Sequence, residues 1–139
     1  MQGIPTQFLI SPPAAQVNGS TAPVNPLDAS GYVAAVIAVY IGANDADWTT
    51  LKLQESPDNS SWTDVAGADF SIGPNVLPSS SDSYVIWEWQ INLALRQRYL
   101  RPIQTIGTGV NGAFLTTIAQ LYPSPPQSTD TNATQQISI

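Results

Sequence analysis

Proline and glycine residues interrupt this chain at short intervals, and this limits the length of any regular element. The 139 residues include 12 prolines and 9 glycines. Proline inside a helix removes a hydrogen bond and clashes with the preceding turn. Only 10% of the residues are charged, so the strong helix formers Glu, Lys and Arg are scarce. The sequence therefore favours short strands joined by turns over long helices.

Two segments show the side-chain patterns of strands. Residues 31–41 form a near-continuous apolar run, β-branched in its second half, which is typical of a strand covered on both faces. In residues 48–55, Leu51 and Leu53 alternate with Lys52 and Gln54. Alternation with period two predicts a strand with one face on a core.

The turn-forming residues 56–61 separate that strand from the short segment 62–65, so the two segments predict an antiparallel hairpin. Further strands are predicted at residues 84–91, 99–106 and 113–122. The stretch 92–98 fits either an extension of the preceding strand or one helical turn, because it is too short for periodicity to decide.

Several apolar side chains share a face of these strands and are candidates for the core. The candidates from strand parity are Leu51, Leu53, Val85, Trp87, Trp89 and Ile91. The four tryptophans of the chain favour core or subunit-interface packing, although exposed indoles would suit a sugar-stacking platform.

Strands at short spacing, without alternating long helices, predict an all-β fold, an antiparallel sandwich or a barrel. We expect this domain to span residues 31–122. Residues 1–30 carry five prolines and predict an extended N-terminal arm, and residues 123–139 predict an extended C-terminal tail that docks through Ile137 and Ile139. Both ends are expected to become ordered by lying on a neighbour.

The residue inventory excludes the commonest catalytic machinery. The chain has no histidine and no cysteine, so Ser-His-Asp and Cys-His arrangements are impossible. Zinc also loses its preferred ligands, and we expect no metal and no cofactor. Residues 44–47, Asn-Asp-Ala-Asp, are similar to the opening of a calcium loop but lack its later glycine and glutamate. A solvated turn is the preferred interpretation, and a bound ion stays open.

A pair of carboxylates could still hydrolyse a glycoside. The candidates are Asp64, Asp69, Asp82 and Glu88. Nothing in their spacing favours that reaction. Strand alternation points Glu88 away from the neighbouring indoles, toward solvent or an interface. We therefore predict a protein that is not an enzyme, with no catalytic residues.

Charge and hydropathy exclude two kinds of partner. A formal net charge of −6 with four basic residues disfavours nucleic acid, because binding needs cations that neutralise phosphates. No apolar run approaches the roughly 20 residues needed to cross a bilayer, and the start of the chain lacks a charged signal-peptide region. We expect a soluble protein made without secretory targeting.

Three of the four basic residues, Arg96, Arg98 and Arg101, lie close together in the sequence. Arginine makes bidentate contacts with carboxylates, so these residues are candidates for an interface with a partner or a sister subunit. Internal pairing with the chain's own carboxylates is equally compatible with the sequence.

Three motifs give the chain a resemblance to a known family. They are LKLQES at residues 51–56, SWTDV at residues 61–65 and RYLR at residues 98–101. In this order they resemble the capsid cement, or decoration, proteins of tailed bacteriophages, over roughly residues 31–122. Similar hairpins also occur in phage tail and fibre modules.

The resemblance implies a jelly-roll-like sandwich on the outer surface of the virion head. There it would bind the major capsid protein, commonly as a homotrimer, and stabilise the lattice without catalysis. It also implies that Trp62 packs beneath the hairpin as part of the core and that Arg101 anchors the later strand. The alternative function is a carbohydrate- or receptor-binding module of a phage tail or fibre.

Overall fold

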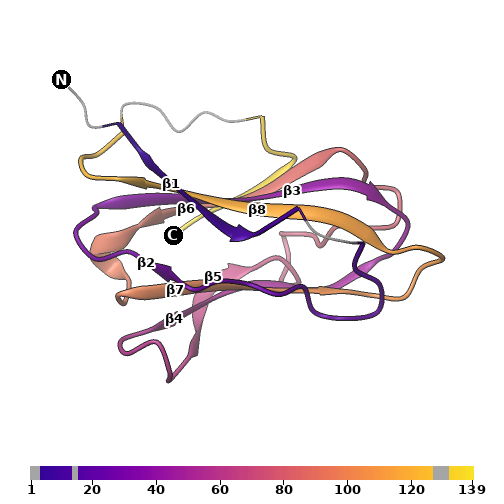
Figure 1. Cartoon of the computed structure of the whole chain (residues 1–139), viewed down its shortest axis with the longest axis horizontal. Coiled ribbons are helices and arrows are strands. Elements are labelled where there is room, and N and C mark those ends of the chain that lie inside the picture. The colour runs from indigo at the N-terminus through magenta and orange to yellow at the C-terminus, as the bar shows by residue number, and fades with distance from the viewer. Residues whose placement is uncertain (1–3, 14–15, 127–131) are drawn as a thin grey trace.

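The protein, seen here in a computed structural model, is a β-sandwich. The structure describes residues 4–13, 16–126 and 132–139. Among these residues, nine strands form two sheets that pack face to face (Figure 1). All strand pairs are antiparallel except the pair of β6 and β9. The prediction of an all-β, mainly antiparallel sandwich is confirmed.

The first sheet has the strand order β1-β8-β3-β6-β9, and the second has the order β2-β7-β4-β5. The strand bounds are β1 Thr6–Ser11, β2 Leu27–Asp28, β3 Ala34–Asn44, β4 Trp48–Ser56, β5 Thr63–Asp69, β6 Val85–Asn92, β7 Tyr99–Ile106, β8 Ala113–Tyr122 and β9 Gln135–Ser138. The predicted hairpin is present as β4 and β5. A 3-10 turn, η1 (Leu93–Leu95), follows β6 directly and settles the alternative left open at residues 92–98.

The core lies between the two sheets and is built from the alternating side chains of their strands. Leu51, Leu53, Trp87 and Trp89 are fully buried there. Both indole N–H groups donate to backbone carbonyls, Trp87 to Val76 O at 2.9 Å and Trp89 to Ala68 O at 3.0 Å. Hydrogen bonding of this kind removes the cost of burying an indole N–H. Of the remaining candidates, Ile91 is buried in the core and Val85 packs against it partly exposed.

Trp62 differs from the expectation, because it lies outside the core. It immediately precedes β5 and is half-buried. The guanidinium of Arg101 lies 4.2 Å from the centroid of its ring. Since Arg101 alternates along β7 with the buried Leu100, this contact lies on the outer face of the four-stranded sheet.

The described part of residues 1–30 belongs to the sandwich, in contrast to the predicted extended arm. β1 pairs with β8, β2 pairs with β7, and the side chains of Ile10 and Leu27 are fully buried. The prolines of this segment fall outside the strands, so they do not interrupt pairing. Residues 1–3 and 14–15 lie outside the described part of the chain.

A buried network of hydrogen bonds joins the N-terminal segment to the other sheet. Gln104 on β7 is fully buried and donates from Nε2 to Ser11 Oγ on β1 at 3.0 Å. Its Oε1 accepts a hydrogen bond from Thr117 Oγ1 on β8. Because the amide is satisfied on both sides, its burial joins the two sheets without leaving an unpaired group.

The C-terminal segment also pairs within its own chain. β9 lies parallel to β6, with Ile137 opposite Trp89 and buried in the core. The pairing continues at Ile139, whose N–H donates to Gln90 O at 2.9 Å and whose carbonyl accepts from Asn92 N–H at 2.7 Å. Where it is described, the predicted tail thus becomes ordered on its own sheet. Residues 127–131 lie outside the described ranges.

The contribution of β1 to the folded core can be tested with a control residue from the same segment. Ile10 is 0% exposed and Ile4, in the same segment, is 86% exposed. We expect Ile10→Ala to lower the free energy of unfolding by about 2–5 kcal/mol because it leaves a cavity. Ile4→Ala should change it by no more than about 0.5 kcal/mol. Chemical denaturation of both variants measures this, and equal, small effects would show that β1 does not belong to the folded core.

Candidate functional site

The two outer faces of the sandwich differ in charge. In the strands β1, β3, β6, β8 and β9 of the first sheet, Glu88 is the only residue with a charged side chain. The shorter strands of the second sheet carry Asp28, Lys52, Glu55, Asp64, Asp69 and Arg101. One broad side of the molecule is therefore almost free of charge.

We call the outer face of the five-stranded sheet the neutral face. It is formed by side chains that alternate with core residues along β1, β3, β6 and β8. Its members include Leu9, Val36, Ala38, Tyr40, Ile86, Glu88, Phe114, Thr116, Ile118 and Gln120. Solvated outer faces of antiparallel sheets are normally polar, so an apolar outer face indicates a contact surface.

At least four hollows lie along the described part of the neutral face. The largest of these four, about 430 Å³, lies at one end, between Tyr122 and Ile139. A second, of about 410 Å³, is lined by Pro13, Tyr40 and Phe114. Two smaller ones, of about 170 and 220 Å³, lie over the middle of the sheet and beside Leu9. Several shallow hollows along one face suit side chains of a protein partner better than one enclosed substrate.

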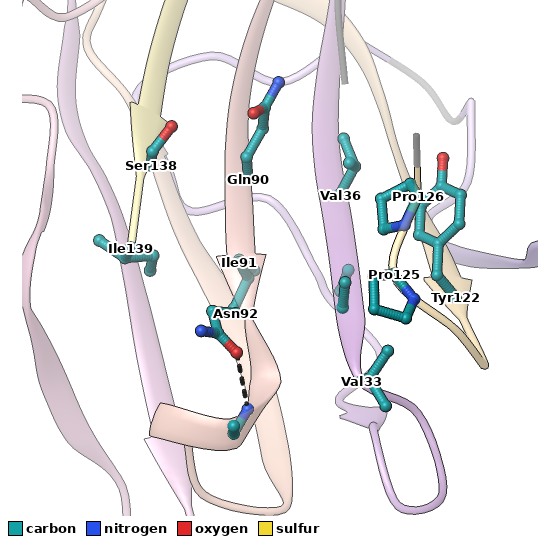
Figure 2. A pocket seen from close by; sticks show the side chains of 13 residues that line it. Val33, Val36, Gln90, Ile91, Asn92, Tyr122, Pro125, Pro126, Ser138 and Ile139 are labelled. Atoms are coloured by element: carbon teal, nitrogen blue, oxygen red, sulfur yellow. Dashed lines mark hydrogen bonds between the residues drawn. The ribbon is translucent and has the colours of Figure 1, made fainter. Parts of the chain in front are cut away.

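The largest hollow is a groove between two separate parts of the C-terminal segment. Figure 2 shows Pro125 and Pro126 beside Tyr122 on one side and Ser138 and Ile139 on the other, with Val36 between them. Among the residues that the structure describes, none with an acidic or basic side chain lines it. This described lining offers apolar contact and a few neutral hydrogen-bonding groups.

Glu88 lies on the neutral face with its carboxylate buried. Its side chain points away from Trp87 and Trp89, as predicted, but only 2% of the residue is exposed, which excludes the solvent-facing one of the two expected positions, solvent or an interface. It borders the hollow of about 170 Å³ together with Tyr40 and Gln120. Gln90 Nε2 lies 3.4 Å from its Oε1. It lies on β6, which is between β3 and β9 in the sheet.

The outer face of the four-stranded sheet, unlike the neutral face, carries polar and charged side chains that pair across the strands. Arg101 lies directly across from Gln54, and Gln54 lies directly across from Asp64. Arg101 donates twice to Gln54 Oε1, at 3.0 and 2.8 Å, and Gln54 Nε2 donates to Asp64 at 2.8 Å. Lys52 Nζ adds an ion pair to Asp64 at 2.8 Å. Cross-strand pairing thus arranges a polar row over three strands.

The other two arginines are also paired inside the chain. Arg98 contacts both carboxylate oxygens of Asp28, at 3.0 and 2.9 Å. Arg96 Nη1 lies 3.8 Å from Glu55 Oε1. Arg96 and Arg98 therefore pair with the chain's own carboxylates, the second of the two possibilities that the sequence left open, whereas Arg101 is held by the amide of Gln54. Of the two apolar candidates, Ile137 is buried in the chain's own core and Ile139 lines the groove.

Hydrogen bonds from these cations lower the pKa of their carboxylate partners. The pKa of Asp28 lies below its usual value, chiefly because of the hydrogen bond from Arg98 and then that from Ser30 N–H. The pKa of Asp64 is lowered chiefly by the hydrogen bond from Lys52 and then by that from Gln54. Both carboxylates are held ionised, which suits fixed ion pairs and disfavours a role as general acid.

The remaining carboxylates considered for glycoside hydrolysis occupy separate local networks. Asp69 accepts hydrogen bonds from the N–H and hydroxyl of Ser71. Asp82 accepts them from the N–H and hydroxyl of Ser79. Glu88 lies on the outer face of the other sheet. The structure gathers none of the four candidates, Asp64 included, around a shared hollow.

The segment 44–47 forms hydrogen bonds with two neighbouring loops, at residues 79–80 and 111–112. Asp45 accepts hydrogen bonds from Asn111 N–H, at 2.9 Å, and from Gly112 N–H, at 2.7 Å. The side chain of Asn44 donates to Ser79 O at 2.7 Å. Asp47 accepts from Ser80 N–H at 2.7 Å. N–H donors therefore occupy both carboxylate oxygens of Asp45 and one of Asp47, and the described residues contain no cluster of three or more metal-binding side chains.

Comparisons with protein-family models, curated proteins and solved structures give no match for this chain. Within the described ranges, no helix has the length and apolar character needed to span a membrane. Any functional conclusion must therefore come from the geometry of the two faces.

The loop contact at Asp45 predicts a pH-dependent stability. Backbone hydrogen bonds, first from Gly112 and then from Asn111, lower the pKa of Asp45 against the cost of desolvation. Its stabilisation is present above the unfolded-state pKa of about 3.9 and is lost as the pH falls through the lower folded-state value. Asp45→Asn should melt at a lower temperature than the wild type at neutral pH, and the gap should close in acid. Melting curves across pH measure this; a gap that is constant with pH would contradict the charge-based explanation.

Proposed function

We propose that this chain is a structural virion protein. On this proposal it is a capsid cement, or decoration, protein that binds the outer surface of the major capsid protein lattice of a tailed bacteriophage. It would act as a homotrimer, stabilise the head and perform no catalysis.

The neutral face carries this proposal. Interface cores are depleted in charged residues and enriched in aromatic ones, and this face combines Tyr40 and Phe114 with aliphatic side chains around four hollows. The charged face on the other side suits contact with solvent. A molecule with one adhesive side and one solvated side fits a subunit that lies flat on a protein lattice, where many weak contacts add up through multivalency.

The position of the resemblance motifs also supports the proposal. Residues 51–56 and 61–65 form the β4–β5 hairpin, and residues 98–101 enter β7, which pairs with β4. Arg101 contacts both Gln54 and Trp62. The segments that resemble cement proteins are therefore neighbours in the fold, as expected if they describe one shared structural unit.

The strand order supports a jelly-roll arrangement. β1-β8-β3-β6 in one sheet face β2-β7-β4-β5 in the other, with β9 added at an edge. Eight strands divided equally between two sheets, with paired strands far apart in the sequence, are typical of jelly rolls. This architecture occurs in viral capsid domains but also in lectins, so it supports the proposal without deciding it.

Binding to phage heads tests the function directly. Phe114 is 45% exposed on the neutral face, and Val110, at 89%, lies in the loop before β8. The wild type and Val110→Glu should co-sediment with heads stripped of decoration protein. Phe114→Glu should weaken binding by about tenfold or more, because it buries a charge in the contact. Failure of the wild type to bind any such heads would overturn the proposal.

The charged face favours a second candidate function, glycan binding by a tail or fibre module. Half-buried Trp62 lies against the guanidinium of Arg101, which is hydrogen-bonded to Gln54, and aromatic rings flanked by polar groups suit sugar rings. Immobilised glycans or host cells should then retain the wild type but not Trp62→Ala, while Phe114→Glu should bind normally. Retention that depends on Trp62, without binding to heads, would select this alternative.

A further inference from the structure

The edge of the five-stranded sheet formed by β1 is open. β1 pairs with β8 on one side. On its other side, in the part of the chain that the structure describes, one backbone hydrogen bond reaches it, from Asn25 N–H to Ile10 O at 2.9 Å. The segment Thr6–Leu9 thus presents an edge to which another strand could be added.

The other described sheet edges are protected. β2 is only two residues long. β5 carries Asp64 and Asp69, and its pairing with β4 changes register. β9 is four residues long and contacts β5 of the other sheet. Short length, charges and irregular register are the usual devices that stop edges from pairing. The segment Thr6–Leu9 has no charge and no proline, and the irregularity in β1 comes only after Leu9.

Apolar side chains flank this open edge on both sides. Leu9 lies opposite Ile118 on the neutral face, and Phe8 lies opposite the core residue Ala119. Phe8 and Leu9 are 45% and 48% exposed. A hollow of about 220 Å³ lies beside them. An added strand would therefore gain backbone hydrogen bonds and also apolar contacts above and below the sheet.

We propose that a second copy of this chain covers the β1 edge and the adjoining part of the neutral face. This inference specifies a surface for the proposed homotrimer and depends on the proposed function only for the number of copies. In a closed ring, each copy would place β1 against its neighbour.

Charge favours a second copy as the occupant of the β1 edge. Each copy has a formal net charge of −6, so two copies repel each other wherever their acidic surfaces meet. β1 and its neighbours β8 and β3 contain no charged residue. At the β1 side, two copies can therefore make contact without bringing their negative charges together. Interfaces between identical subunits are also more apolar than transient interfaces.

Sedimentation equilibrium of the full chain at increasing concentrations tests the inference. Leu9→Lys places a charge on the edge, and Val110→Lys places the same charge on an exposed apolar residue elsewhere. The wild type and Val110→Lys should form the same oligomer, and Leu9→Lys should associate about tenfold or more weakly. Backbone amide exchange in Thr6–Leu9 of the wild type should slow as the oligomer forms, and this readout decides the matter if Leu9→Lys fails to fold.

Two results would overturn the inference: a wild type that stays monomeric at every concentration, or an oligomer with unchanged amide exchange at β1 and unchanged affinity in Leu9→Lys. Head binding separates this failure from that of the proposed function. A wild type that binds heads as a monomer would contradict the inferred β1 interface and support the head-binding function. An oligomer that is weakened by Leu9→Lys but does not bind heads would support the β1 interface and contradict the head-binding function.

Discussion

Apolar contact between the two sheets is the interaction on which the other features depend. Trp87 and Trp89 from β6 meet Leu51 and Leu53 from β4 in one continuous core, and the ring of Phe70 lies 5.3 Å from that of Trp89. Burying a large apolar side chain contributes roughly 1.5–3 kcal/mol. A chain without cysteine has no disulfide to supplement this. Its first and last strands must therefore add to the core, and Ile10 and Ile137 do so.

The small number of charges then shapes the surface. Lys52, Arg96, Arg98 and Arg101 each contact an acidic or amide side chain within the chain, and three of these contacts include β4. With its cations used on the four-stranded side, the molecule leaves the other broad face apolar. A surface of this kind is costly in water, since it stays exposed until a partner covers it. This asymmetry is the physical reason for proposing a binding role.

Local pattern predicted much of the fold. The alternation in residues 48–55 and the turn at 56–61 give the β4–β5 hairpin, and β7 and β8 begin and end at the predicted residues. The same alternation placed Trp87 and Trp89 together in the core. The prolines of the N-terminal segment predict an arm, and the short strands between them are not recognisable locally, because their pairing partners, β8 for β1 and β7 for β2, lie far along the sequence. The resemblance implied a core position for Trp62, and strand parity could not test this because Trp62 lies just outside β5.

The sequence by itself determined the class of fold and the range of chemistry, because side-chain period, turn residues and the absence of histidine and cysteine are local properties of the chain. Tertiary structure alone decided which strands lie at the edges, that Glu88 is buried, that the arginines pair internally and that one face is almost free of charge. These depend on contacts between residues distant in sequence, such as Arg98 with Asp28 and Gln104 with Ser11. No local pattern encodes such contacts, since strand order and register arise only when the two sheets pack together.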